Sequence, residues 1–196
     1  MKKSFSKIFT TVSAAIIFAS IVGGNAVFAE VTTSSPSTSA NITGGTLSMD
    51  EMVISNFKDE SQNETIKLDG TKQEIFAEIN DITIKDPTGT GNGWNVMVEA
   101  GRVTSGDNDL GFERLFFQAP VIEAGEGSSP ANTITTYGGF IDKADASSLK
   151  VLSAVADGGM GAYTIDFAPL KLTLNPSEVY TGNYSTTVKV TLTTGP

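Results

Sequence analysis

The clearest indication of the fold is the stretch Gly89-Thr90-Gly91-Asn92-Gly93-Trp94-Asn95-Val96-Met97-Val98-Glu99-Ala100. From Trp94 onward the side chains alternate with a period of two, so Trp94, Val96, Val98 and Ala100 share one face and a mostly polar set shares the other. The glycine-rich run before it bends freely and delivers the only tryptophan of the chain to the start of this segment. The stretch therefore predicts a half-buried β-strand with Trp94 as its core anchor.

Short alternating segments separated by Gly and Pro breakers continue from Thr46 to the last residue. They predict strands at 47–49 with 53–54, 65–68, 75–79, 82–84, 115–117, 133–137, 149–156, 163–167, 170–174 and 184–192. The alternation changes phase at Asn80-Asp81, which predicts a bulge or a turn. Only Ala144 to Leu152 has an alternative interpretation, as a short helix. Together the segments predict a single all-β domain, an antiparallel β-sandwich of Ig-like or Greek-key type.

Residues 1–29 have the features of a secretory signal peptide. Three lysines precede an apolar run, and Val27 and Ala29 occupy the positions that a signal peptidase reads, so we expect cleavage after Ala29. Residues 30–45 are rich in Ser and Thr, which predicts a flexible lead-in. Residues 46–196 would form the folded domain. No second apolar run is long enough to span a bilayer, so we expect a secreted protein located at the cell surface.

The composition excludes several classes of function. The exported chain keeps 10 of the 13 basic residues and all 22 acidic ones, a net charge of −12, so nucleic acid is not an expected partner. The chain has no histidine and no cysteine, which excludes Ser-His-Asp and Cys-His catalysis, His-based zinc sites and disulfide bonds. Paired carboxylates are the only catalytic groups left, and no spacing selects a pair. We therefore expect no enzyme activity and no cofactor.

Two short motifs have both a ligand-binding and a structural interpretation. The glycine run 89–93 looks like a phosphate loop, but it lacks the P-loop lysine and opens a strand rather than a helix, which favours a structural turn. Four acidic or amide side chains of one loop could offer oxygens to Ca²⁺, namely Asp107, Asn108, Asp109 and Glu113. Their spacing does not match an EF-hand loop, so solvated acids are the simpler interpretation, and the same holds for Glu123 and Glu126. We expect no metal site.

Trp94 also has two interpretations. In the core it would fill the sandwich and donate its indole N–H to a nearby carbonyl group, whereas on the surface it would stack on a sugar ring or a peptide. Its phase with Val96 and Val98 favours the core. The other aromatic residues in or beside predicted strands are interpreted as core or turn aromatics: Tyr137, Phe140, Tyr163, Phe167, Tyr180 and Tyr184.

Several segments of the exported chain resemble the WxL domain of Gram-positive cell-surface proteins. Residues 81–98 combine a strand, an Asp-Pro-Thr-Gly-Thr-Gly loop and the tryptophan, and residues 182–196 combine Gly-Asn-Tyr with an alternating strand. Val96 stands where the family has its name-giving leucine, and the family's second aromatic motif lacks its tryptophan beside Tyr163. The motif residues that carry over, which we expect to be structural, are Gly89, Gly91, Gly93, Trp94, Val96 and Tyr184.

The resemblance implies a non-catalytic protein held non-covalently to cell-wall peptidoglycan, together with other WxL-type surface proteins or a membrane-anchored partner. Walls rich in teichoic acid are also anionic, so attraction of this acidic chain would need local polar or stacking contacts, or bridging cations. An alternative hypothesis is a structural subunit of a surface assembly or fibre that pairs by strand addition through residues 30–45. A third hypothesis is a hydrolase that acts on wall polymers.

Overall fold

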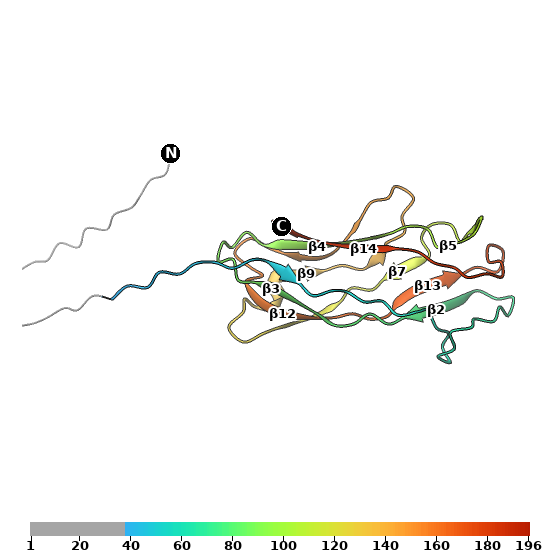
Figure 1. Ribbon diagram of the computed structural model, residues 1–196, viewed down its shortest axis with the longest axis horizontal. Helices are drawn as coiled ribbons and strands as arrows, with labels where there is room; N and C mark the ends of the chain where they lie inside the picture. Colours follow the sequence, from blue (N-terminus) through green and yellow to red (C-terminus); the bar gives the residue numbers. More distant parts are fainter. Residues whose placement is uncertain (1–37) are drawn as a thin grey trace, which may run out of the picture. The chain divides into compact units, whose positions relative to one another are not determined.

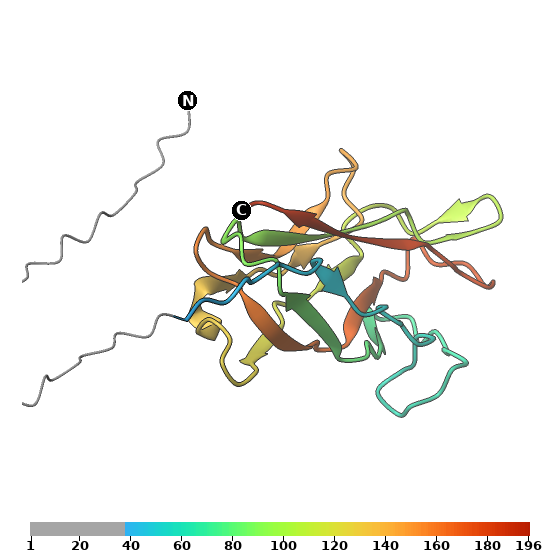
Figure 2. The same cartoon turned by 60° about the vertical axis from the view of Figure 1, so that its left-hand side comes forward.

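The computed structural model describes residues 38–196, and Asn41–Pro196 form one compact unit. The predicted signal peptide, residues 1–29, and the first part of the predicted lead-in lie outside the described residues. The compact unit is all-β, as predicted, and its strands form two layers (Figures 1 and 2). Within residues 38–196, no helix has the length and apolar character needed to cross a membrane.

The strands are short and are separated by turns, as expected for a chain with 20 glycines and 7 prolines. In chain order they are β1 (Ser48–Met49), β2 (Gln73–Ala77), β3 (Ile82–Asp86), β4 (Trp94–Ala100), β5 (Thr104–Ser105), β6 (Asn108–Asp109), β7 (Leu115–Phe117), β8 (Val121–Ala124), β9 (Ile134–Thr136), β10 (Gly139–Phe140), β11 (Leu149–Ala154), β12 (Gly161–Asp166), β13 (Leu170–Leu174) and β14 (Val188–Thr194). A 3-10 turn, η1 (Ala131–Thr133), precedes β9.

The first layer is the antiparallel sheet β14-β4-β11-β9. Strand β4 lies inside this sheet and pairs with β14 on one side and with β11 on the other. Val96 and Val98 are completely buried on its inner face, whereas Met97 and Glu99 lie on the outer face. The predicted alternation of this strand is therefore confirmed. Figure 1 shows β4 and β14 running side by side along this layer.

The second layer consists of two sheets, β1-β3-β12-β8 and β10-β7-β13-β2, that continue one another. Ile165 pairs with Ile82, and Leu170 pairs with Ala77. Five residues separate the paired positions on both antiparallel segments, so no residue is inserted in either. The register is therefore continuous across the break between the two sheets. Pro169 stands at this break, where its missing N–H prevents a ladder hydrogen bond.

The break between the two sheets also explains the change of phase that the sequence predicts at Asn80-Asp81. Ile79 is buried at an odd position before the break and Ile82 at an even position after it. In the paired segment the buried positions also change from odd to even at the same level, between Ile165 and Leu170. The predicted bulge or turn is thus a bend shared by adjacent strands, which keeps the apolar side chains of both halves directed into one core.

The core lies between the two layers. Trp94, Tyr163 and Phe117 are its largest fully buried side chains. Phe117 meets Phe167 edge-on, with ring centroids 5.6 Å apart, a preferred arrangement for aromatic pairs. A chain without disulfides depends on this core for its stability.

Near the N-terminal end, the strand predicted at 53–54 is only partly right and the strand predicted at 65–68 is wrong. Of residues 53–54, only Ile54 pairs, in an isolated bridge with Ile79. Residues 65–68 form no strand. Asp69, immediately after them, accepts the Thr71 backbone N–H at 2.8 Å, which favours a turn.

The helical interpretation of Ala144 to Leu152 is wrong. Its second half belongs to β11, which is held between β4 and β9. In its first half the Asp145 carboxylate accepts the Ser147 N–H at 3.0 Å, a local turn that competes with a helix. The sequence patterns also missed the short strands β5, β6, β8 and β10, because two to four residues are too few to establish an alternation.

Candidate functional site

The glycine-rich loop and Trp94 form a closed corner at the start of β4. Trp94 is completely buried, and its indole N–H donates a hydrogen bond to the carbonyl oxygen of Gly159 at 2.9 Å. Its ring packs against Tyr163 with centroids 6.2 Å apart. The Tyr163 hydroxyl lies 2.8 Å from the Ser129 carbonyl oxygen, so both polar aromatic groups are satisfied inside the core. The core interpretation of Trp94 is therefore confirmed.

The corner leaves no room for side chains at two glycines. A Cβ on Gly93 would clash with the Ala154 carbonyl oxygen and would lie 2.8 Å from that of Val155, and its φ of +71° disfavours other residues. A Cβ on Gly159 would lie 2.7 Å from the indole nitrogen of Trp94. This packing indicates a structural corner, with no space for a ligand beside the indole.

The six motif residues do not form one site. Gly89, Gly91 and Gly93 all have positive φ in the loop, and Val96 is buried two residues beyond Trp94. Tyr184 lies beyond the other end of the β4–β14 pair, where its hydroxyl accepts the Tyr180 backbone N–H at 3.1 Å.

The loop acids considered for Ca²⁺ are partly engaged in local contacts. Asp109 forms a salt bridge with Arg102 at 2.7 Å, and its other oxygen accepts the Gly111 N–H at 2.8 Å. Asn108 and Asp109 belong to β6 of a small hairpin with β5. Across residues 38–196, no group of three or more acidic side chains is arranged to hold a metal ion.

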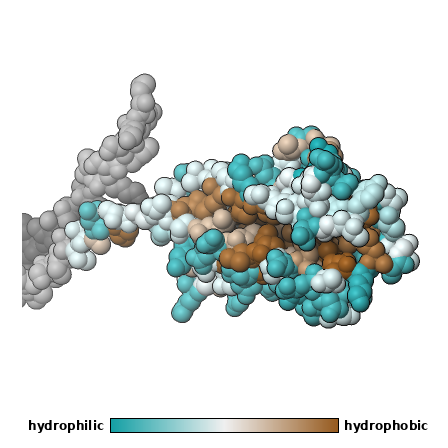
Figure 3. Space-filling view, turned by 45° about the vertical axis from the view of Figure 1, so that its right-hand side comes forward, coloured by the Kyte–Doolittle hydropathy of each residue, from teal (hydrophilic) through white to brown (hydrophobic). Residues whose placement is uncertain are grey.

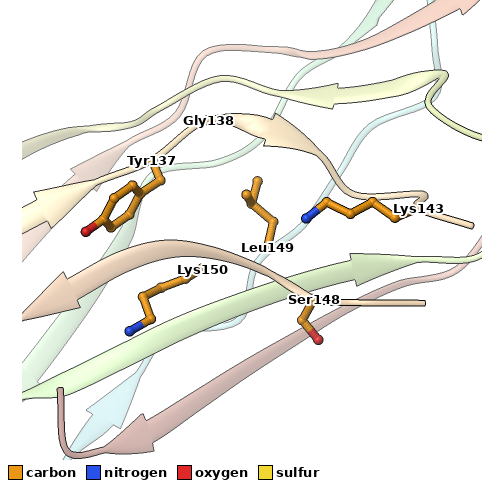
Figure 4. Close-up of a pocket in the computed structure, with 6 residues that line it drawn as sticks. All are labelled: Tyr137, Gly138, Lys143, Ser148, Leu149 and Lys150. Atoms are coloured by element: carbon orange, nitrogen blue, oxygen red, sulfur yellow. The ribbon is translucent and has the colours of Figure 1, made fainter. Parts of the chain in front are cut away.

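An open groove of about 410 Å³ lies beside β11, on the same layer as the Trp94 corner. It is lined by Tyr137, Gly138, Lys143, Ser148, Leu149 and Lys150 (Figure 4). Tyr137 follows β9, and 44% of its surface is exposed. Figure 4 shows Tyr137 and Lys150 at one end of the groove, with the ammonium group of Lys143 pointing towards Leu149. We name this surface the Tyr137 groove.

Among the described residues, two lysines and no acidic side chain line the Tyr137 groove. Lys143 and Lys150 form no salt bridge with any residue of the described part. Asp145 lies near Lys143, and the Ser147 N–H together with Lys143 holds the pKa of this carboxyl below its ordinary value. Glu99 lies at the edge of the groove, where its carboxylate binds Lys189 at 2.8 Å and the hydroxyl of Ser148, a lining residue, at 2.7 Å. The two lysines are therefore available to an anionic ligand.

A buried carboxylate anchors the loop that carries Lys143. Asp142 is completely buried and accepts the backbone N–H groups of Arg114 at 2.8 Å and of Leu115 at 3.0 Å. Burial raises the pKa of Asp142, although both N–H groups oppose the shift. The backbone at Lys143, the next residue, is thus held in place by Asp142, and its side chain lines the groove.

The groove residues have weak signals in the sequence. Tyr137 is one of six aromatic residues interpreted as core or turn aromatics, and the structure divides that set. Tyr163 and Phe167 are buried, whereas Tyr137 and Tyr180 are exposed. Lys143, Ser148 and Lys150 carry no motif at all. The sequence alone does not show that Tyr137 is exposed beside two lysines, because this arrangement depends on how the strands pack in the folded domain.

Comparison with known proteins identifies the family of the chain. A family model described as "WxL domain surface cell wall-binding" matches residues 27–196. No curated protein and no solved structure matches the chain. The matched region covers nearly the whole chain, so the resemblance of the chain to this family is confirmed. The chain therefore belongs to the WxL domain family of cell wall-binding surface domains.

Proposed function

We propose that this domain holds its protein non-covalently to cell-wall peptidoglycan, and that the Tyr137 groove makes the contact. One observation carries the assignment: an exposed tyrosine ring lies beside two unpaired lysines in a chain whose exported part has a net charge of −12. The protein would be secreted, would catalyse no reaction, and would act beside other WxL-type proteins or a membrane-anchored partner.

The chemistry of the groove suits a glycan that carries acidic groups. The flat face of a tyrosine packs on the apolar face of a sugar ring. Lysine ammonium groups attract carboxylates of peptide stems or phosphates of attached polymers, and the attraction is local because salt screens it beyond about 10 Å. Local attraction removes the difficulty that both the chain and the wall are acidic overall.

Co-sedimentation with isolated Gram-positive cell walls tests the proposal. Residues 30–196 should pellet with the walls, and Tyr137→Ala should bind about tenfold more weakly because it removes the stacking surface. Tyr180→Ala is the matched control, since Tyr180 is 62% exposed and lies outside the groove. Wild-type protein that stays in the supernatant at low and moderate salt would refute the proposal.

A second pair of variants separates charge from stacking. Lys143→Gln with Lys150→Gln should weaken binding at low salt and lose that effect at high salt. Lys67→Gln with Lys72→Gln removes the same charge from an exposed loop outside the groove and should leave binding unchanged. If a chelator abolishes binding while the groove variants bind normally, bridging cations and not the groove hold the protein. Release of muropeptides during the incubation would instead support a hydrolase.

A further inference from the structure

Strand β14 is an open edge of the first layer. It pairs with β4 on one side, and no described strand pairs with its other side. Gly101 N–H donates to Thr187 O at 3.3 Å and Gly195 N–H donates to Gly93 O at 2.9 Å, so the odd-numbered residues bond to the β4 side. The N–H and C=O groups of Val188, Val190 and Leu192 therefore point outward, ready to pair with another strand.

Most features that usually block edge pairing are missing from β14. Val188–Thr194 contains no proline and pairs with β4 without a register shift. Its one charged side chain, Lys189, is bound to Glu99 of its own sheet at 2.8 Å. The other outer strands β8, β9 and β10 have only four, three and two residues, and Ile54 and Lys58 form bridges beside β2. Among the described strands, β14 is the long unprotected edge.

We propose that β14 pairs antiparallel with β14 of a second copy of this chain, about a two-fold axis at Thr191. This register places Val190 opposite Leu192 of the second copy, and both residues have outward-facing backbone groups. Lys189 faces Thr193 of the second copy, so no like charges are opposed. The strand is thus complementary to itself in charge, apolar contact and hydrogen bonding.

Apolar side chains on this side of the sandwich favour a second copy. Val188, Val190 and Leu192 are only half-buried, and so are Leu47 and Met49 of the segment that carries β1. Figures 1 and 2 both place β1 across from β14. Figure 3 shows that one side of the domain carries a band of apolar side chains. Pairing would cover the inward-facing apolar row of β14, which solvent reaches in a single copy.

The pairing would also place two Tyr137 grooves on one surface. Thr191 pairs with Met97 and Met97 with Lys150, so all three side chains lie on the outer face of the first layer. Antiparallel pairing about Thr191 keeps the outer faces of both copies on the same side of one eight-stranded sheet. If the proposed function holds, such a dimer would bind the wall bivalently.

Cysteine cross-linking tests the pairing independently of wall binding. The chain has no cysteine, so a single introduced thiol reports one position. Thr191→Cys should form a disulfide-linked dimer under mild oxidation, because directly opposed non-hydrogen-bonded residues have Cα atoms about 4.5 Å apart. Thr193→Cys is the matched control, since it faces Lys189 of the second copy and should cross-link at least about tenfold more slowly. Adding Lys189→Cys to this control should restore the cross-link.

Sedimentation of the wild-type exported chain gives the second measurement. A dimer should form at concentrations up to about 100 μM, and Val190→Pro should weaken it by removing an outward N–H. Thr136→Pro, which removes an outward N–H at the opposite edge of the same sheet, should dimerise normally. A monomer at every concentration, or Thr191→Cys that oxidises no faster than Thr193→Cys, would overturn the proposal. Neither result depends on whether the Tyr137 groove binds the wall.

Discussion

The Trp94 corner and the Tyr137 groove lie on the same layer but use their aromatic rings in opposite ways. Trp94 has no exposed surface, its N–H is bonded to Gly159, and its ring packs on Tyr163. Tyr137 is 44% exposed at an open groove, which is also lined by two lysines that form no salt bridge with any described residue. The residue that best identifies the family thus stabilises the fold, whereas the groove proposed to bind the wall is lined by residues that belong to no sequence motif.

Truncating the two rings should separate these roles most strongly. Trp94→Ala should lower the free energy of unfolding by about 3–5 kcal/mol, because it opens a large cavity and leaves a carbonyl group unpaired. Tyr137→Ala should change it by less than about 0.5 kcal/mol, as expected for an exposed position. Urea unfolding followed by far-UV circular dichroism measures both. Equal losses of stability would contradict the division between corner and groove.

Glycine substitutions should show how closely the corner is packed. Gly93→Ala should cost about 2–3 kcal/mol, because the new Cβ meets two carbonyl oxygens in a backbone conformation that alanine disfavours. Gly127→Ala is the matched control: Gly127 has a φ of +76°, but nothing lies within 4 Å of a Cβ there. It should cost only about 1 kcal/mol. Thermal unfolding that finds the two variants equal would show that backbone strain alone explains the effect.

Asp142 should make the groove loop sensitive to pH. Asp142→Asn should cost about 1–3 kcal/mol, because the amide can accept only one of the two backbone N–H groups. Burial raises the pKa of Asp142, so the folded chain holds this proton more tightly than the unfolded chain. Its contribution to stability should therefore fall as the pH rises from about 4 through the raised pKa, and stay constant above it.

The stability difference between wild type and Asp142→Asn isolates this titration from the other carboxyls. Urea unfolding at a series of pH values, followed by Trp94 fluorescence, should show the difference shrinking as the pH rises through that window. A difference that grows with pH would mean that the two N–H groups outweigh burial.

How much of the molecule the sequence predicts depends on how local the signal is. The phase of Trp94 with Val96 and Val98 is local, and it correctly predicts a buried strand with the indole N–H bonded to a carbonyl group. The phase change at Asn80-Asp81 is also local and marks the shared bend. The phase change cannot show that neighbouring strands bend at the same level, because this common bend depends on pairing between segments that are distant in the sequence.

The Tyr137 groove could not be predicted in the same way. A register shift between Lys150 and Leu152 buries two successive residues and places Lys150 on the outer face, which no alternation reveals. The loop that carries Lys143 is anchored because Asp142 accepts the backbone N–H groups of Arg114 and of Leu115 in β7, which are far away in the sequence. The exposure of Tyr137 likewise depends on which strands neighbour the chain after β9. These three facts are properties of tertiary pairing rather than of any local pattern.

Fluorescence of the single tryptophan tests whether the wall contact avoids the Trp94 corner, because the emission reports on Trp94 alone. Wall fragments are added to the exported chain until co-sedimentation shows that binding is saturated. We expect a blue-shifted emission that the bound fragments neither shift nor quench, since Trp94 lies inside the core and the proposed wall contact is at Tyr137. A red shift or quenching of the emission by the fragments would contradict it, and would place the wall contact at the Trp94 corner.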